Sequence, residues 1–231
     1  MVRIKRFIQS IRDYYAEGQA GDIAFLKFKL LGLSATPEIL SQLQGLEGYA
    51  PNIDLAALSQ LPVGTFGYEY AQHMHRNGIH PLVISADLQA EAQQDPFALR
   101  YTVTHDMFHV LLGFDTSYAG EVGVFAFMTA QNYSKFFKVA LPIVSKIYPL
   151  LFWGQKRQIK AHLQTGKALG EQAQCLLAYR LEDHWTRPLV DVRSELGLIL
   201  DEGDVPEVRC DRNNNSAKNT RDDPAQEALA A

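Results

Sequence analysis

The chain has 231 residues, of which 47% are hydrophobic and 21% charged, as expected for a globular protein of one domain. Its net charge of −4 gives no overall attraction to nucleic acid, so no nucleic-acid partner is expected. No segment holds the uninterrupted run of about eighteen apolar residues that a transmembrane helix needs. The two cysteines, Cys175 and Cys210, lie in unlike contexts, which favours a reducing compartment over a structural disulfide.

The spacing of the apolar residues predicts an all-α protein, a single-domain helical bundle with short loops. In chain order, the expected helices are 3–16, 22–32, 37–45, 52–58, 65–77, 95–112, 121–140, 142–165, 168–186 and 188–198. Thr36 is expected to cap the third helix and Gly78 to end the fifth. The bundle should occupy residues 1–200. Residues 201–231 are polar and low in complexity, and we expect a disordered tail there.

The stretch "HDMFHVLLGFDTSYAGE", residues 105–121, carries the residues best suited to chemistry. His105 and His109 are four positions apart, so on a helix they lie about 40° apart, with Asp106 on the near flank. Imidazole nitrogens and carboxylate oxygens are the usual ligands of zinc, and of non-haem iron or manganese. Helices also bury histidines for packing, so the pair alone leaves a metal site and a packed core as alternatives.

Glu121 strengthens the metal alternative. It follows a break rich in turn residues, which lets the chain reverse and bring Glu121 toward the two histidines. Alternatively, Glu121 is a first-turn acid favoured by the helix dipole, and Asp106 is an ion-pair partner of Arg100. Asp106 stands where zinc proteases have a glutamate base, so their pattern is not met.

A metal phosphohydrolase is a further alternative, because such enzymes combine a His-Asp doublet with other ligands. That site would need another histidine and a later aspartate to make a two-metal centre. The sequence offers candidates for both, namely His73, His75, His80, Asp183 and Asp191.

The central stretch resembles the coenzyme Q biosynthesis protein 4 family, because it matches His-Asp-x-x-His, eleven residues, then Glu. The segment "LPVGTFGYEYAQHM" is similar to that family's turn-to-helix segment, and "EDHWTRPLVDVRSELGL" to its C-terminal signature. The resemblance covers residues 20–200 or so. Because no transit peptide is recognised at the N-terminus, we expect a bacterial-type homologue.

The resemblance implies an all-α protein of ubiquinone biosynthesis that binds a divalent metal ion, with zinc expected first and magnesium, manganese or iron as alternatives. By the motif match, the ligands would be His105, Asp106, His109 and Glu121. Two roles follow for the family. One is an enzyme that removes the carboxyl group from a polyprenylated hydroxybenzoate ring, with oxidation at that carbon. The other is a non-catalytic organiser of quinone-biosynthesis proteins that binds prenyl lipid.

Beside the metal, Arg100 and Tyr101 are the candidate substrate-binding residues. Arg100 could pair with an anionic head group, and Tyr101 could donate a proton, although the sequence assigns no catalytic residue. The expected partners are a prenylated lipid or isoprenoid quinone precursor, other quinone-biosynthesis proteins, and a second copy of the chain in a homodimer.

The most apolar stretch, residues 135–157, mixes aromatics with lysines and ends in Phe152 and Trp153. By residue pattern, a core helix with snorkelling lysines and a helix lying in a membrane interface are both reasonable. The family resemblance favours the second, which predicts a cytoplasmic protein held peripherally on the inner face of a membrane. Phe125, Phe127, Met128, Phe136 and Phe137 are candidate walls for a prenyl tail, or ordinary core residues.

Overall fold

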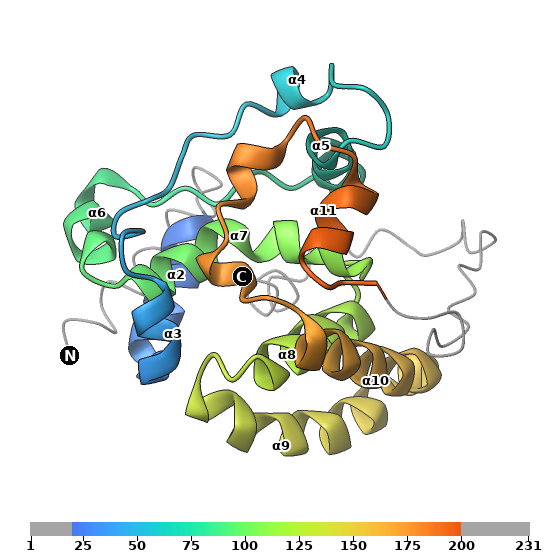
Figure 1. Cartoon of the computed structure of the whole chain (residues 1–231). Coiled ribbons are helices and arrows are strands. Elements are labelled where there is room, and N and C mark those ends of the chain that lie inside the picture. The colour runs from blue at the N-terminus through green and yellow to red at the C-terminus, as the bar shows by residue number, and fades with distance from the viewer. Residues whose placement is uncertain (1–19, 200–231) are drawn as a thin grey trace.

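Helices dominate the computed structural model, which describes residues 20–199 and confirms the all-α prediction (Figure 1). The α-helices are α2 (Ala20–Leu30), α3 (Pro37–Gln42), α4 (Leu55–Leu58), α5 (Phe66–Asn77), α6 (Ala86–Gln93), α7 (Pro96–Leu112), α8 (Tyr118–Ala130), α9 (Lys135–Leu151), α10 (Lys156–Gln172) and α11 (Leu189–Glu195). Three 3-10 turns occupy Trp153–Gln155, Leu176–Ala178 and Leu181–His184. The predicted helix 3–16 and the predicted tail 201–231 lie outside the described residues.

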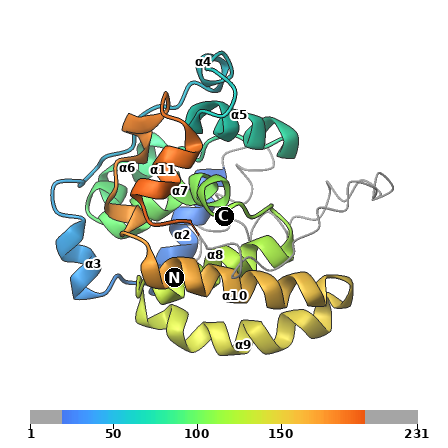
Figure 2. The ribbon, with the colours of Figure 1, turned by 45° about the vertical axis from the view of Figure 1, so that its right-hand side comes forward.

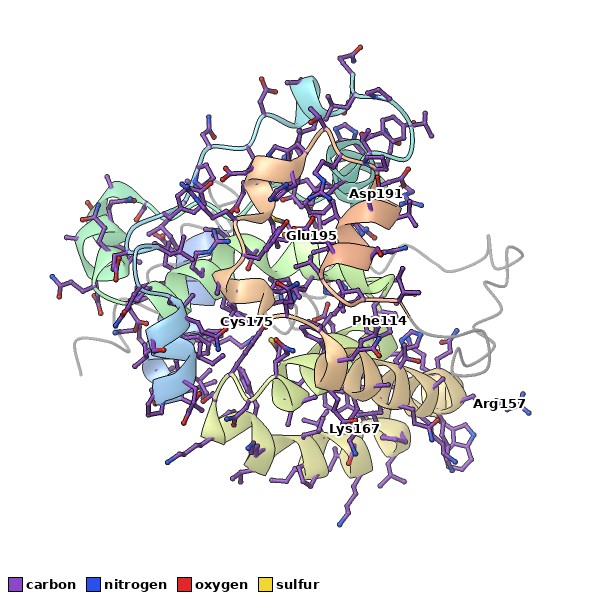
Figure 3. The ribbon with its side chains drawn as sticks, viewed as in Figure 1. Phe114, Arg157, Lys167, Cys175, Asp191 and Glu195 are labelled. Atoms are coloured by element: carbon purple, nitrogen blue, oxygen red, sulfur yellow. The ribbon has the colours of Figure 1, made fainter. Side chains whose placement is uncertain are left out.

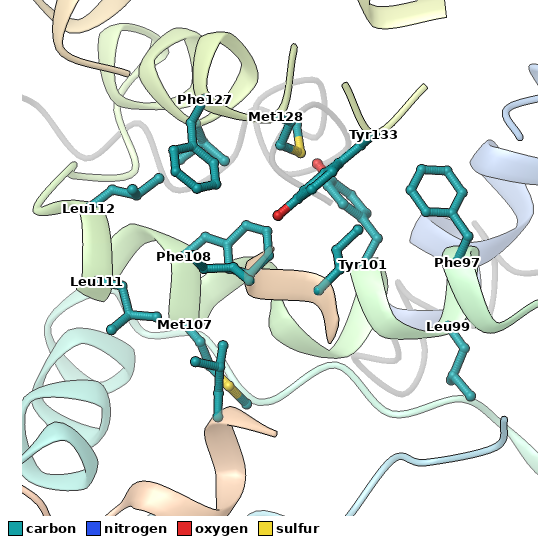
Figure 4. Close-up of a cluster of buried hydrophobic side chains, with 14 of the residues drawn as sticks. Phe97, Leu99, Tyr101, Met107, Phe108, Leu111, Leu112, Phe127, Met128 and Tyr133 are labelled. Atoms are coloured by element: carbon teal, nitrogen blue, oxygen red, sulfur yellow. The ribbon is translucent and has the colours of Figure 1, made fainter. Parts of the chain in front are cut away.

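Helix α7 crosses the middle of the molecule, with α8, α9 and α10 on one side and α4, α5 and α11 on the other (Figures 1 and 2). Nearly all of its side chains are buried. Phe108 contacts Phe127 of α8 and Tyr133, with ring centroids 6.2 Å and 6.5 Å apart, as the close-up of the core shows (Figure 4). A helix that is apolar on every side is typical of the centre of a protein, so α7 is the axis of the core.

The layer of α8, α9 and α10 is held together by close backbone contact between α8 and α10. A Cβ atom at Gly166 of α10 would stand 2.1 Å from the carbonyl oxygen of Gly123 in α8. No side chain could be accommodated at that distance, and a Cβ atom at Gly170 would stand 2.6 Å from the carbonyl oxygen of Phe127, so the two helices approach this closely because α10 has glycine at both positions.

The two segments "LPVGTFGYEYAQHM" and "EDHWTRPLVDVRSELGL", which are far apart in sequence, contact each other in the structure. The amides of Phe66 and Gly67 donate to the carbonyl oxygens of Arg187 and Trp185, at 2.8 Å and 2.9 Å. The Trp185 ring stacks on that of Phe66, with centroids 4.8 Å apart. The segment 182–198 therefore anchors the start of α5.

The expected helices 121–140 and 142–165 are wrong in their boundaries. Helix α8 already ends at Ala130, because Asn132 takes a left-handed conformation with φ of 58°. Ser134 then caps α9, its hydroxyl accepting from the amide of Phe136. Helix α9 continues through Pro142 and Pro149 to Leu151, so three helices cover the region where two were expected.

The expected helix 168–186 is also wrong, because α10 ends at Gln172 and 3-10 turns follow. Gln131 donates to the carbonyl oxygens of Gly170 and Ala173, and Arg100 takes those of Leu177 and Tyr179. These carbonyl oxygens accept hydrogen bonds from distant side chains in place of the backbone amides that would continue a helix.

Two smaller differences complete the comparison with the expected elements. Thr36 makes no side-chain cap to α3 and donates instead to the carbonyl oxygen of Asn132. Helix α6 was not expected, although Ser85 stands at its N-cap position.

Candidate metal centre

The ends of α7 hold its histidines in a fixed rotational position. Asp95 caps the start, its carboxylate accepting from the amide of Ala98, and Pro96 occupies the first turn. At the other end, the guanidinium of Arg193 donates to the carbonyl oxygens of Val110 and Leu111, both at 2.8 Å. The C-terminal segment thus satisfies carbonyls that have no partner within the helix.

A tight turn brings Glu121 back against α7. Gly113 ends α7 with φ of 75°, a conformation that favours glycine, and Ser117 caps α8. A Cβ atom at Gly120 would stand 1.8 Å from the carbonyl oxygen of Asp115, so only glycine fits there. Glu121 therefore lies in the first turn of α8, as the first-turn alternative expected, and it also faces the histidines.

Three of the four predicted ligands converge on one point. The Nε2 atoms of His105 and His109 are 3.3 Å apart. The carboxylate oxygens of Glu121 lie 3.4 Å from Nε2 of His105 and 3.0 Å from Nε2 of His109. Both histidine side chains are nearly inaccessible, and that of Glu121 is 14% exposed. Within residues 20–199, this is the one group of three or more such side chains close enough to hold an ion.

The donor set fits a divalent ion of the zinc type. Zinc binds imidazole nitrogens and carboxylate oxygens at about 2.0–2.1 Å, which places tetrahedral ligands roughly 3.3–3.4 Å from one another. The two Nε2 atoms, 3.3 Å apart, match such an edge, and each lies within 3.4 Å of one carboxylate oxygen of Glu121, Oε2 for His105 and Oε1 for His109. Three protein ligands would leave at least one position open for water or substrate.

Without an ion, the site behaves as a buried ion pair. Burial disfavours a charged imidazole, but the carboxylate of Glu121 outweighs burial and raises the pKa of His109 to about 9. Burial alone would raise the pKa of Glu121, yet the charge on His109 and hydrogen bonds from both histidines lower it to about 2. A proton shared among these groups occupies the place that a metal ion would take.

Asp106, the fourth predicted ligand, does not belong to the three-residue group. It is half-buried, and burial raises its pKa although His105 and His109 act in the opposite direction. Its ligand role stays a prediction. Tyr101 does lie at the centre, because its ring centroid is 5.2 Å from that of His105. Burial and the charge of Glu121 raise the pKa of Tyr101, so its hydroxyl stays protonated.

Arg100 is occupied elsewhere. Its guanidinium is fully buried and donates to both carboxylate oxygens of Glu182, at 2.6 Å and 3.3 Å. Further donations reach the carbonyl oxygens of Leu177 and Tyr179. The alternative pairing of Arg100 with Asp106 is therefore wrong, since Arg100 pairs with Glu182. Substrate contact by Arg100 stays a prediction, but each of its three nitrogens already has an acceptor.

Two further residues lie beside the three converging side chains: His73, which the sequence offered only as an extra histidine of the phosphohydrolase alternative, and Lys27, which it did not single out. His73 of α5 stacks on His109, with ring centroids 5.8 Å apart and planes 18° from parallel. Lys27 of α2 is close enough to Glu121 for the carboxylate to raise its pKa, although burial, the larger effect, lowers it. Both residues come from helices distant in sequence, so local spacing could not have placed them here.

The phosphohydrolase alternative receives no second cluster from the described residues. His75, His80 and Asp191 are exposed, and Asp183 accepts a hydrogen bond from the hydroxyl of Tyr49 at 3.0 Å. None of them joins the group of His105, His109 and Glu121. The candidate site is therefore a single centre.

Helix α9 presents apolar side chains to solvent and buries only Phe137. The exposed apolar face comprises Phe136, Val139, Ile143, Ile147, Leu150, Leu151 and Trp153. Lys156, Arg157 and Lys160 are exposed just beyond it, and Arg157 extends away from the ribbon in Figure 3. A packed-core helix is not what the structure has. Among residues 20–199, no single helix could cross a membrane by length and hydropathy, whereas α9 with residues 153–172, bent by 109°, passes that test as a pair.

Comparisons with known proteins agree on one family. The model of the family "Coenzyme Q (ubiquinone) biosynthesis protein Coq4" matches residues 35–201. The mitochondrial ubiquinone biosynthesis protein COQ4 homolog of Rattus norvegicus is 29% identical over 150 residues, covering 63% of this chain and 55% of the relative. That of Xenopus laevis is 28% identical over 161 residues, covering 68% and 54%. The chain thus spans about half the length of the curated relatives it matches.

A solved structure supports the fold. The crystal structure of a protein from Nostoc punctiforme PCC 73102, provisionally named for ubiquinone biosynthesis, superposes with a TM-score of 0.55 and 22% identity. The match covers 86% of this chain and 97% of that one. At this identity, the likeness shows the fold alone.

Proposed function

This chain belongs to the Coq4 family of coenzyme Q (ubiquinone) biosynthesis proteins, and on that premise we propose that it holds a catalytic divalent ion, zinc first, through His105, His109 and Glu121. The reaction proposed is decarboxylation of a prenylated hydroxybenzoate ring. The observation that carries the proposal is the convergence of three ligand atoms, one from each residue, that all lie within 4.8 Å of one another in a nearly buried site. Asp106 is proposed as a fourth ligand or as a charge beside the ligands.

The site's own residues suit such a reaction. A bound zinc ion would act as a Lewis acid that polarises a carboxylate or phenolate oxygen. When the bond between ring and carboxyl carbon breaks, its electron pair stays on the ring and a proton replaces the carbon dioxide that leaves. Tyr101 stays protonated beside His105 and is our candidate for supplying that proton. In an oxidative form, a hydroxyl group takes the place of the carbon dioxide that leaves: water supplies its oxygen, and dioxygen accepts the two electrons and is reduced to hydrogen peroxide.

A prenyl tail needs an apolar path away from this head-group site. Phe127, Met128 and Phe137 are packed into the core, so these candidate walls act as core residues in the structure. Phe136 is 42% exposed and belongs to the outward face of α9. The outward face is the better place for contact with lipid.

We propose that α9 rests on a membrane surface, which would make the protein peripheral. The support is its exposed apolar face beside exposed basic residues at the start of α10, an arrangement that favours anionic lipid. Other quinone-biosynthesis proteins are proposed partners on the basis of the family. A second copy of this chain is another candidate to cover the face.

The deciding experiment uses zinc-loaded protein and a prenylated 4-hydroxybenzoate labelled in its carboxyl carbon. We expect labelled carbon dioxide from the wild type, and none above background from Glu121→Gln. Asp106→Asn separates the two roles of that residue, because loss of zinc identifies a ligand and retained zinc identifies a charge beside it.

The organiser role predicts a different result from the same preparation. The labelled substrate would bind and co-purify with the protein, but no labelled carbon dioxide would appear with or without added oxidant. That outcome would contradict the enzyme reading and leave lipid binding intact.

A further inference from the structure

His73 has an unexplained buried nitrogen. Its side chain is 7% exposed, and Nε2 is buried with no hydrogen-bond partner. A buried polar atom of this kind normally has a protein or solvent partner, because leaving it unpaired costs free energy. The ring lies parallel to that of His109 at 5.8 Å, on the border of the metal centre.

Contacts at both ends of α5 fix the position of His73 beside His109. Helix α5 is capped by Thr65 and anchored to residues 185–189 by backbone hydrogen bonds. At the far end, Asn77 donates to the carbonyl oxygen of His73 at 2.8 Å and accepts from the hydroxyl of Thr116 at 3.0 Å. Thr116 belongs to the turn that delivers Glu121. The histidine and the ligand-bearing turn are thus tied to each other.

His73 stands beside the ligand group without joining it. The donor atoms of His105, His109 and Glu121 all lie within 4.8 Å of one another, and no donor of His73 meets that condition. Ligands of one ion lie closer together than this, so His73, which packs against the ring of His109, is not placed as a ligand of the same ion. The position suits contact with an oxygen atom bound to the ion, and not with the ion itself.

We propose that Nε2 of His73 forms a hydrogen bond with the oxygen atom that takes the open position of the ion, whether of water or of the carboxylate of an aromatic substrate. This inference rests on the proposed metal site and adds a substrate-contacting residue to it. A contact of this kind fixes the orientation of the carboxylate, which three ligands on one side of the ion leave undetermined.

The test uses the full chain loaded with cobalt(II), whose visible bands report the ligands of the ion, and titrated with 4-hydroxybenzoate. His73→Phe should bind cobalt within about twofold of the wild type, since no ligand is lost. It should bind 4-hydroxybenzoate about ten- to a hundredfold more weakly, the usual range for losing one hydrogen bond to a charged group.

Two conservative variants sharpen the test. The amide nitrogen of glutamine falls near Nε2 of histidine and that of asparagine near Nδ1, so His73→Gln should recover most of the affinity and His73→Asn little. His162→Phe is the matched control, because His162 is 5% exposed and also has an unpartnered nitrogen, but it packs on Phe114. It should leave both titrations unchanged.

The outcomes are separable. If the wild type binds no cobalt, the metal site and this inference fall together. If cobalt and 4-hydroxybenzoate bind equally well to wild type and His73→Phe, the inference on His73 alone is overturned. If His73→Phe loses cobalt itself, His73 is a ligand and the proposed position outside the ligand group is wrong.

Discussion

Helix α7 carries two buried charged clusters that differ in how they are satisfied. Near its start, Arg100 and Glu182 are paired at 2.6 Å, and the remaining nitrogens of the guanidinium reach backbone carbonyls. Near its end, His105, His109 and Glu121 turn their Nε2 atoms and carboxylate oxygens toward one another, and no other ligand-bearing side chain of the described residues joins the group.

This difference indicates that Arg100 and Glu182 stabilise the fold, whereas His105, His109 and Glu121 are suited to bind a ligand. A buried charge whose hydrogen bonds are complete holds the fold, because nothing further is needed to offset its desolvation. A buried cluster in which two imidazole nitrogens and a carboxylate face one shared point is one that a divalent ion would complete. The sequence made Arg100 a candidate for substrate binding. From this comparison we now expect Arg100 to position α7.

The largest expected effect on stability comes from removing one charge of the buried pair of Arg100 and Glu182. Arg100→Met leaves Glu182 buried without a partner, so the free energy of unfolding should fall by about 3–5 kcal/mol in a urea titration. The exposed pair Lys167–Glu171 is the control, and Lys167→Ala should cost no more than about 1 kcal/mol. A loss below about 1 kcal/mol for Arg100→Met would contradict the structural role.

The double replacement Arg100→Met with Glu182→Leu sharpens the same point. Removing both charges leaves no unpaired group, so the double variant should be more stable than Arg100→Met alone. Urea titration of the two proteins measures the difference. A double variant less stable than the single one would show that Glu182 stabilises the fold by some other contact.

The next largest effect on stability should come from removing the proposed ion from His105, His109 and Glu121. An ion present at about a hundred times its dissociation constant stabilises the folded state by about 2.7 kcal/mol. Dialysis against a chelator should therefore lower the thermal midpoint of the wild type and leave that of Glu121→Gln unchanged. Equal shifts in the two proteins would mean that the ion binds elsewhere.

The group of His105, His109 and Glu121 should also release a proton when the ion binds. The pKa of His109 is raised to about 9 in the ion-free protein, so at pH 7.5 its imidazole is protonated and must lose that proton to become a ligand. Calorimetry in buffers of different ionisation enthalpy should show release of about one proton per ion. The release should vanish as the pH rises above about 10, and its absence at pH 7.5 would contradict the pairing of His109 with Glu121.

The smallest effect on stability is expected on the surface of α9. Ile143→Asp, at a side chain 54% exposed, should change the free energy of unfolding by no more than about 0.5 kcal/mol. It should nevertheless weaken sedimentation of the protein with vesicles of anionic phospholipid. If vesicle binding is unchanged and the wild type is a dimer that the substitution dissociates, the face belongs to a second copy of the chain.

The sequence predicted the grouping of His105, His109 and Glu121 better than the surroundings of that group, for a physical reason. His105, His109 and Glu121 lie within seventeen residues, so helical spacing and one turn suffice to bring them together. Glu182 is 82 positions from Arg100 and stands in a 3-10 turn where a helix was expected. Its pairing depends on tertiary contacts that no local pattern records. The same holds for His73, which reaches His109 from α5.

The central claim is that His105, His109 and Glu121 bind one divalent ion, and native mass spectrometry with metal analysis tests it most directly. We expect one ion per chain in the wild type, and none in His105→Ala or Glu121→Ala, both still folded. Absence of an ion from the wild type even after reconstitution, or its retention by both variants, would contradict the account.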